Sequence, residues 1–279
     1  MEECRMERRL ETGSTLKHVI DKITSTNSSK TRFGSHCEAG RNGAQTAVIK
    51  KTFRQIGALI RKDLGLQFRS KETLVLVFVF SVLVVLIFAF AFGPIFPEKG
   101  ERGKLAASVL WTAFVFAGII TLNRSFTAER SHGALHGIRL TGVDASNLYL
   151  SKVVSTVIFL FLLEIVITPI TLQFLDLLDV VTVGIFLKLF GVLGIGTLGF
   201  CAVGVLLAGM STSTNGGESL LSVILLPIVI PIIMGGAKCT VSLLVTGELA
   251  NGFWLNLLIG YSLVFFASAY LLAAAVIEE

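Results

Sequence analysis

Residues 74–92 read LVLVFVFSVLVVLIFAFAF, a run of aliphatic residues and phenylalanine that contains no charged side chain. A bilayer core about 30 Å thick needs about 20 apolar residues to be crossed by one helix. The run lacks the apolar–polar alternation of a barrel strand, and lipid offers no water to an unpaired backbone group. This stretch therefore predicts a transmembrane helix.

The rest of the chain repeats this pattern. It has 279 residues, of which 53% are hydrophobic and 15% are charged, and its mean hydropathy is +0.78. Soluble domains contain about 25% charged residues, so the composition indicates a membrane protein. We predict an all-α integral membrane protein whose membrane domain, 74–279, has six transmembrane helices, at about 74–92, 105–122, 153–175, 183–210, 219–237 and 253–277.

Two polar segments precede the first predicted span. Residues 1–49 are rich in Ser, Thr, Arg and Gly and show no sustained apolar period, which is typical of a disordered tail. Residues 50–73 place apolar side chains three and four positions apart and basic side chains between them, which predicts an amphipathic helix on an anionic membrane surface. Such a helix either sets the topology alone or also touches a cytoplasmic partner, and the pattern leaves both open.

The distribution of Lys and Arg predicts the orientation. If the N-terminus lies inside, the inner segments 50–73 and 123–152 carry seven and four basic residues, while the outer loops carry five. Basic residues concentrate on the cytoplasmic side, so we expect both termini in the cytoplasm. The predicted topology thus accounts for the net charge of +5. We expect the chain to contact the lipid bilayer and no nucleic acid.

Several kinds of site have no support in the sequence. No P-loop motif for ATP occurs, no two of the four cysteines are spaced as C-x-x-C, and no histidine lies in a predicted span. Neither a nucleophile–base arrangement nor a carboxylate pair stands out. The sequence therefore predicts a chain that is not an enzyme and binds no cofactor itself.

Three features inside the predicted spans allow two interpretations each. Glu164 is either a proton or substrate site or a hydrogen-bonded group that joins two helices. Pro227 and Pro231 predict a kink in the fifth span, which either lines a cavity or is only structural. Gly204 and Ala208 form a small-xxx-small pair, used for packing within the chain or for a subunit contact.

The segment 123–152 is unusually long and polar for a connection between two spans. We predict that it contains a short cytoplasmic coupling helix that sits on a separate ATPase and passes its motion to the membrane helices. A metal site formed by Glu129, His132 and His136 is a weaker alternative, since residues four apart share a helix face.

Several short motifs resemble the CcmB family, the haem exporter protein B of the ABC-type complex for cytochrome c maturation. They are LIRKDLGLQFRSKETL before the first span, Leu110-Trp111, F-x-x-E-x-x-x-G-x-L from Phe126, Ser151-Lys152, and LLPIVIPIIMGG in the fifth span. The resemblance extends over about residues 53–278 and rests on the order and spacing of these motifs. One departure is Thr141-Gly142, where the family usually has a proline.

The resemblance implies an ABC-2-type permease-like fold in the bacterial inner membrane. It also implies an ATPase subunit, a haem-handling membrane subunit and a small membrane subunit as partners, with ATP and haem bound by those partners. ATP hydrolysis would then drive release of a haem-loaded chaperone. The residues expected to couple to the ATPase are Phe126, Glu129, Arg130, Gly133, Leu135 and Leu140.

Two other functions fit the same architecture. One is an ABC-2-type exporter permease for a lipid or a drug, which would use the same six spans and coupling segment. The other is a membrane scaffold that transports nothing and anchors a soluble enzyme.

Overall fold

The computed structural model describes residues 54–93, 95, 98–131, 145–211, 217–250 and 252–278. The chain divides into two units, Met1–Gln55 and Ile56–Glu279, and the second contains the membrane helices. The predicted tail, 1–49, lies outside the described residues. The first described helix covers 54–69, and the chain turns at Ser70 before the next helix begins.

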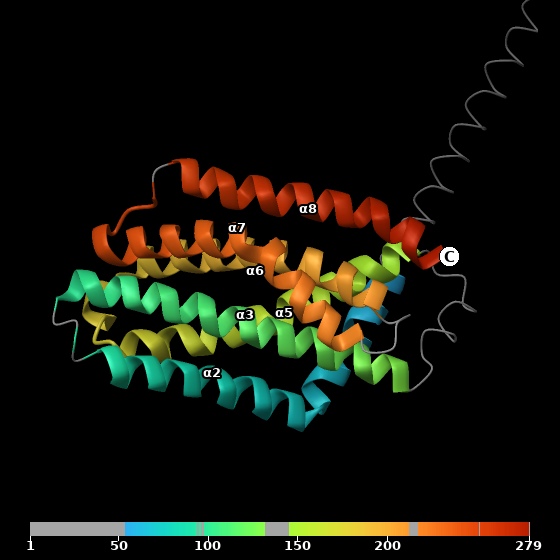
Figure 1. Ribbon diagram of the computed structural model, residues 1–279, viewed down its shortest axis with the longest axis horizontal. Coiled ribbons are helices and arrows are strands. Elements are labelled where there is room, and N and C mark those ends of the chain that lie inside the picture. Colours follow the sequence, from blue (N-terminus) through green and yellow to red (C-terminus); the bar gives the residue numbers. More distant parts are fainter. Residues whose placement is uncertain are drawn as a thin grey trace, which may run out of the picture. The chain divides into compact units, whose positions relative to one another are not determined.

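Six long helices follow, and each is long and apolar enough to cross a membrane. They are α2 (Lys71–Phe92), α3 (Lys99–Ser131), α5 (Ala145–Phe174), α6 (Val183–Ser211), α7 (Gly217–Thr246) and α8 (Gly252–Glu278), with the short 3-10 helix η1 (Leu178–Val180) between α5 and α6. They run side by side in alternating directions (Figure 1). The predicted all-helical fold with six candidate spans is confirmed.

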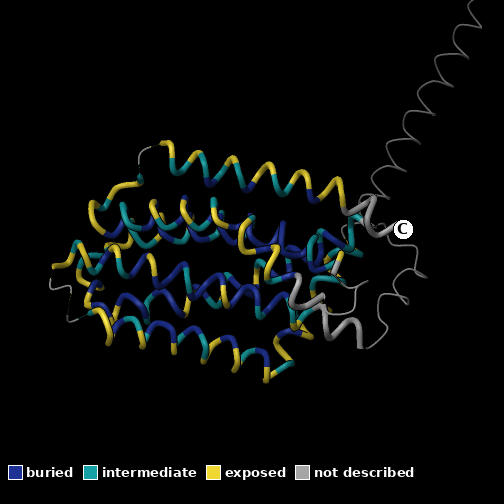
Figure 2. The backbone as a smooth tube through the Cα atoms, viewed as in Figure 1, coloured by how far each residue is buried: buried dark blue, intermediate teal, exposed yellow. Residues whose placement is uncertain are grey.

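Helices α3 and α6 form the centre of this bundle. In their most apolar windows 72% and 67% of residues are buried, against 22% in α2 and 17% in α8. Figure 2 shows the buried residues along the middle of the bundle and the exposed residues along α2 and α8. The apolar side chains exposed on α2 and α8 match a lipid surrounding, since lipid tails are as apolar as leucine.

The helices extend beyond the predicted spans. α3 begins at Lys99 and continues through the polar residues after Leu122, because no Gly or Pro interrupts the chain there before Gly133. α7 continues past Gly235 and Lys238 to Thr246. The length of an apolar run is set by the thickness of the lipid core. A helix ends instead where the sequence supplies a capping residue or a helix breaker.

Candidate functional site

The segment expected to couple to an ATPase lies between α3 and α5. Phe126, Glu129 and Arg130 belong to the last turns of α3, so no separate short helix starts at these residues. Gly133, Leu135 and Leu140 lie outside the described residues. The segment is therefore connected directly to α3 and α5, two of the long helices that form the bundle.

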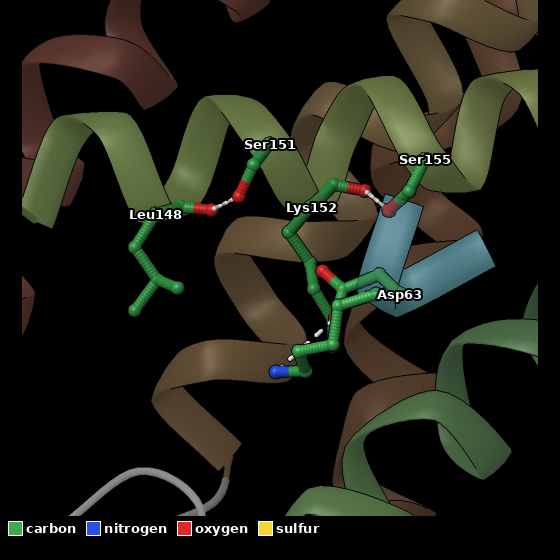
Figure 3. A network of polar contacts seen from close by, with 6 residues as sticks. Asp63, Leu148, Ser151, Lys152 and Ser155 are labelled. Carbon is green, nitrogen blue, oxygen red and sulfur yellow. Dashed lines mark hydrogen bonds and ion pairs between the residues drawn. The ribbon is translucent and has the colours of Figure 1, made fainter. Parts of the chain in front are cut away.

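Helix 54–69 packs against the first half of α5 at the same end of the bundle. Its most buried side chains are polar: Asp63 is 3% exposed and Gln67 is 7% exposed. On α5, Lys152 is also buried and extends toward Asp63 (Figure 3). The Phe68 and Phe159 rings meet edge to face with their centroids 5.6 Å apart. This contact joins the helix that precedes the first span to the helix that follows the coupling segment.

The serine hydroxyls around Lys152 donate to carbonyl groups of α5 itself. Ser155 Oγ donates to the carbonyl of Lys152 at 2.9 Å, and Ser151 Oγ donates to the carbonyl of Leu148 at 2.8 Å (Figure 3). Lys62 Nζ lies 3.4 Å from Asp63 Oδ1. An aspartate buried next to cations is electrostatically compensated, which lets Asp63 sit in the interface.

Two further hydrogen bonds connect this end of the bundle to the interior. Tyr149 Oη donates to the carbonyl of Ala202 at 2.9 Å, which ties α5 to α6. Asn123 Nδ2 lies 3.4 Å from Ser222 Oγ, between α3 and α7. Both helices that flank the coupling segment are therefore held to the core of the bundle.

The core is organised around Trp111, which is 1% exposed. Its Nε1–H donates to Thr240 Oγ1 at 3.0 Å, from α3 to α7. A Cβ atom on Gly236 or Gly196 would overlap the indole, so both positions accommodate the ring only as glycine. Leu110-Trp111 and the end of LLPIVIPIIMGG, two motifs that carried the resemblance, thus meet in the folded chain.

Small residues elsewhere also serve packing within this chain. A Cβ on Gly204 would overlap Leu122 of α3, and Ala208 is fully buried. Pro227 and Pro231 both lie inside the unbroken helix α7, which changes direction part-way along (Figure 1). The Tyr261 hydroxyl donates to the carbonyl of Ile228 in this region, which holds α8 against α7.

Glu164 lies in the middle of α5 and is 4% exposed. Its Oε1 accepts a hydrogen bond of 2.9 Å from Thr197 Oγ1 on α6. A carboxyl group with a hydroxyl donor on a neighbouring helix can join the two helices in the interior of a membrane protein.

Among the described residues, no group of three or more His, Cys, Asp or Glu residues could hold a metal ion. The alternative metal site at Glu129, His132 and His136 is not tested by this observation, because both histidines lie outside the described part of the chain.

The CcmB protein family model matches residues 54–278, nearly the whole described chain. The chain belongs to the CcmB family. No curated protein matches it. CcmB is the permease subunit of the ABC-type haem exporter for cytochrome c maturation, a membrane subunit without catalytic activity whose ATPase partner is CcmA.

This membership confirms the resemblance read from the motifs, and with it the prediction that the chain is not an enzyme. Sequence reasoning did not predict the burial of the polar residues that this CcmB chain places at helix contacts: Asp63, Gln67, Lys152, Thr197 and Thr240. Only the i, i+4 spacing of Asp63 and Gln67 signals that they share one face of a helix.

Proposed function

We propose that CcmA docks where helix 54–69, the end of α3 and the start of α5 lie together, and that this end faces the cytoplasm. The lengths of α3 and α5 carry the proposal. At 1.5 Å per residue, their 33 and 30 residues extend over about 50 Å and 45 Å, against a bilayer core of about 30 Å. Both helices are thus longer than the lipid core, and their polar ends, 123–131 and 145–152, extend out of it next to the segment 132–144.

Three contacts support a mechanical role for this end. The Phe68 and Phe159 rings pack helix 54–69 against α5, the Tyr149 hydroxyl ties α5 to α6, and the Trp111 indole packs α3 against Gly196 of α6. Packed helices move as units, because their interfaces do not deform continuously. A displacement of α3 or α5 by the ATPase would therefore reach the buried helix α6.

The charges on helix 54–69 support the orientation. Arg54, Arg61, Lys62 and Arg69 are all exposed, as expected for a helix that lies on the anionic inner leaflet. Leu66 and Phe68 are 51% and 43% exposed on the same helix and can insert into the lipid headgroup region.

In a complex that also contains a haem-handling membrane subunit and a small membrane subunit, ATP hydrolysis on CcmA would then drive release of a haem-loaded chaperone. ATP and haem would bind to those partners and not to this chain. In support, none of the four histidines falls within a candidate span, so axial imidazole ligands for haem are missing from the membrane part.

A charge reversal tests the docking site. Glu129→Lys changes the end of α3 next to the coupling segment, and Glu101→Lys changes the opposite end of the same helix as a matched control. We expect Glu129→Lys to reduce co-purification of CcmA and the level of c-type cytochromes, and to leave haem-loaded chaperone bound to the complex. Equal effects of the two substitutions would refute the docking site. If the chaperone that stays bound to the complex carries no haem, the release step would be refuted.

Cysteine labelling in intact cells tests the orientation. Arg69 and Glu248 are exposed at opposite ends of the bundle, and each is replaced by cysteine in turn. A membrane-impermeant maleimide should label position 248 at once and position 69 only after permeabilisation. The reverse order would show that the orientation is wrong.

A further inference from the structure

A small cavity lies beside Glu164, where four helices meet. Its volume is about 10 Å³, which is room for about one water molecule. Most of the lining side chains are apolar, and two carry oxygen atoms. The lining consists of Ser81 from α2, Leu110, Ala113 and Phe114 from α3, Leu163, Glu164 and Ile167 from α5, and Leu193 from α6.

The Glu164 carboxyl is only partly satisfied by the protein. Oε1 accepts from Thr197 Oγ1, but that hydroxyl also lies 2.8 Å from the carbonyl of Leu193, so one proton serves two acceptors. Oε2 is buried and has no hydrogen-bond partner among the described residues. A buried carboxyl oxygen without a partner is costly, which favours a small polar ligand next to it.

One hydroxyl group of the cavity lining, that of Ser81, can share such a ligand. Ser81 is 1% exposed, and its Oγ donates to the carbonyl of Val77 at 2.8 Å, so its lone pairs remain able to accept.

We propose that this cavity binds a single buried water molecule that bridges Glu164 Oε2 and Ser81 Oγ. The water connects α5 to α2, the first membrane helix, while the Thr197 hydroxyl connects α5 to α6. A metal cation fits the cavity less well, because hard cations take six or more oxygen ligands and two polar side chains line this space. A bridging water needs only two to four polar partners.

Radiolytic hydroxyl-radical labelling of the purified complex in H₂¹⁸O tests the proposal, because radicals formed from a bound water modify the side chains around it. We expect ¹⁸O incorporation at Phe114 and Leu163, with exchange slower than at Leu249, which is exposed in the loop between α7 and α8. Glu164→Leu should lower the labelling of Phe114 at least fivefold. Glu164→Gln, which can still bind water, should lower it less than twofold.

Ser81→Ala provides a second variant if Glu164→Leu does not fold. It removes one partner of the water, so ¹⁸O exchange at Phe114 should become faster. Thr156→Ala, which removes another buried hydroxyl that donates to the carbonyl of Lys152 in its own helix and lies away from the cavity lining, is the control and should leave the labelling at Phe114 unchanged. Labelling at background level, exchange as fast as at Leu249, or a change in labelling when sodium in the buffer is replaced by choline would each overturn the proposal.

Discussion

The contact between Trp111 and Gly236 gives the sharpest prediction for stability. In Gly236→Ala the added methyl group would overlap the indole ring, which Thr240 holds in place from the next turn of α7. Overpacking a core costs about 1–3 kcal/mol. Alanine regains about 0.5–1 kcal/mol over glycine in a helix, so we expect a net loss of up to about 2.5 kcal/mol.

Gly191→Ala is the matched control. Nothing lies within 4 Å of a Cβ atom built at Gly191 on α6, so this variant should gain only the helix propensity. The free energy of unfolding is measured for each by titrating mixed micelles with a denaturing detergent. Since about 1.4 kcal/mol is a tenfold change in an equilibrium constant, the expected difference between the two variants is measurable.

A double-mutant cycle separates the overlap from other effects. Trp111→Phe shortens the ring and makes room for the methyl group, so the combination of Trp111→Phe with Gly236→Ala should lose less than the sum of the single losses. We expect an interaction energy of about 1 kcal/mol, within the range of residues in contact. Additivity within about 0.3 kcal/mol, or a Gly236→Ala variant as stable as Gly191→Ala, would refute the reasoning.

Three other variants test single contacts. Thr240→Ala leaves the Trp111 Nε1–H without its acceptor and should destabilise the chain by about 0.6–1.7 kcal/mol in detergent unfolding, while Thr240→Ser should restore most of the loss. Tyr149→Phe removes the hydroxyl bond to α6 and should cost about 1 kcal/mol; an unchanged midpoint would argue against that bond. Arg102→Gln breaks an ion pair of 3.2 Å with Asp176, which is 73% exposed, so its effect should stay below about 1 kcal/mol and vanish in high salt.

The six spans could be predicted because lipid imposes a length and a composition on any helix that crosses it. Glu164 also stood out, since a carboxyl in an apolar run is rare. The pairing of Trp111 with Gly236 could not be predicted, because the two residues lie far apart in the sequence and glycine carries no side chain that would indicate a partner. The fifth span was predicted to end at about residue 237, whereas the helix continues to Thr246 and uses Gly236 for close packing.

The interface of helix 54–69 was only partly predictable. Its apolar period indicated an amphipathic helix, but that criterion assigns polar residues to the exposed face. Asp63 and Gln67 are buried instead, because helix 54–69 packs against α5, which begins only at Ala145 and could not be paired with it from the sequence. The coupling residues remain a prediction, since their side chains are not among those described.

The hydrogen bond between Thr197 and Glu164 has a consequence for how the chain enters the membrane. α2 has no charged residue between its first turn and its end, and a mean hydropathy of 3.3, so it can rest alone in lipid as soon as it is synthesised. α5 carries a carboxyl whose partner emerges 33 residues later, on α6. During biogenesis α5 should therefore stay near the translocon until α6 arrives, so that the two helices leave it as a pair.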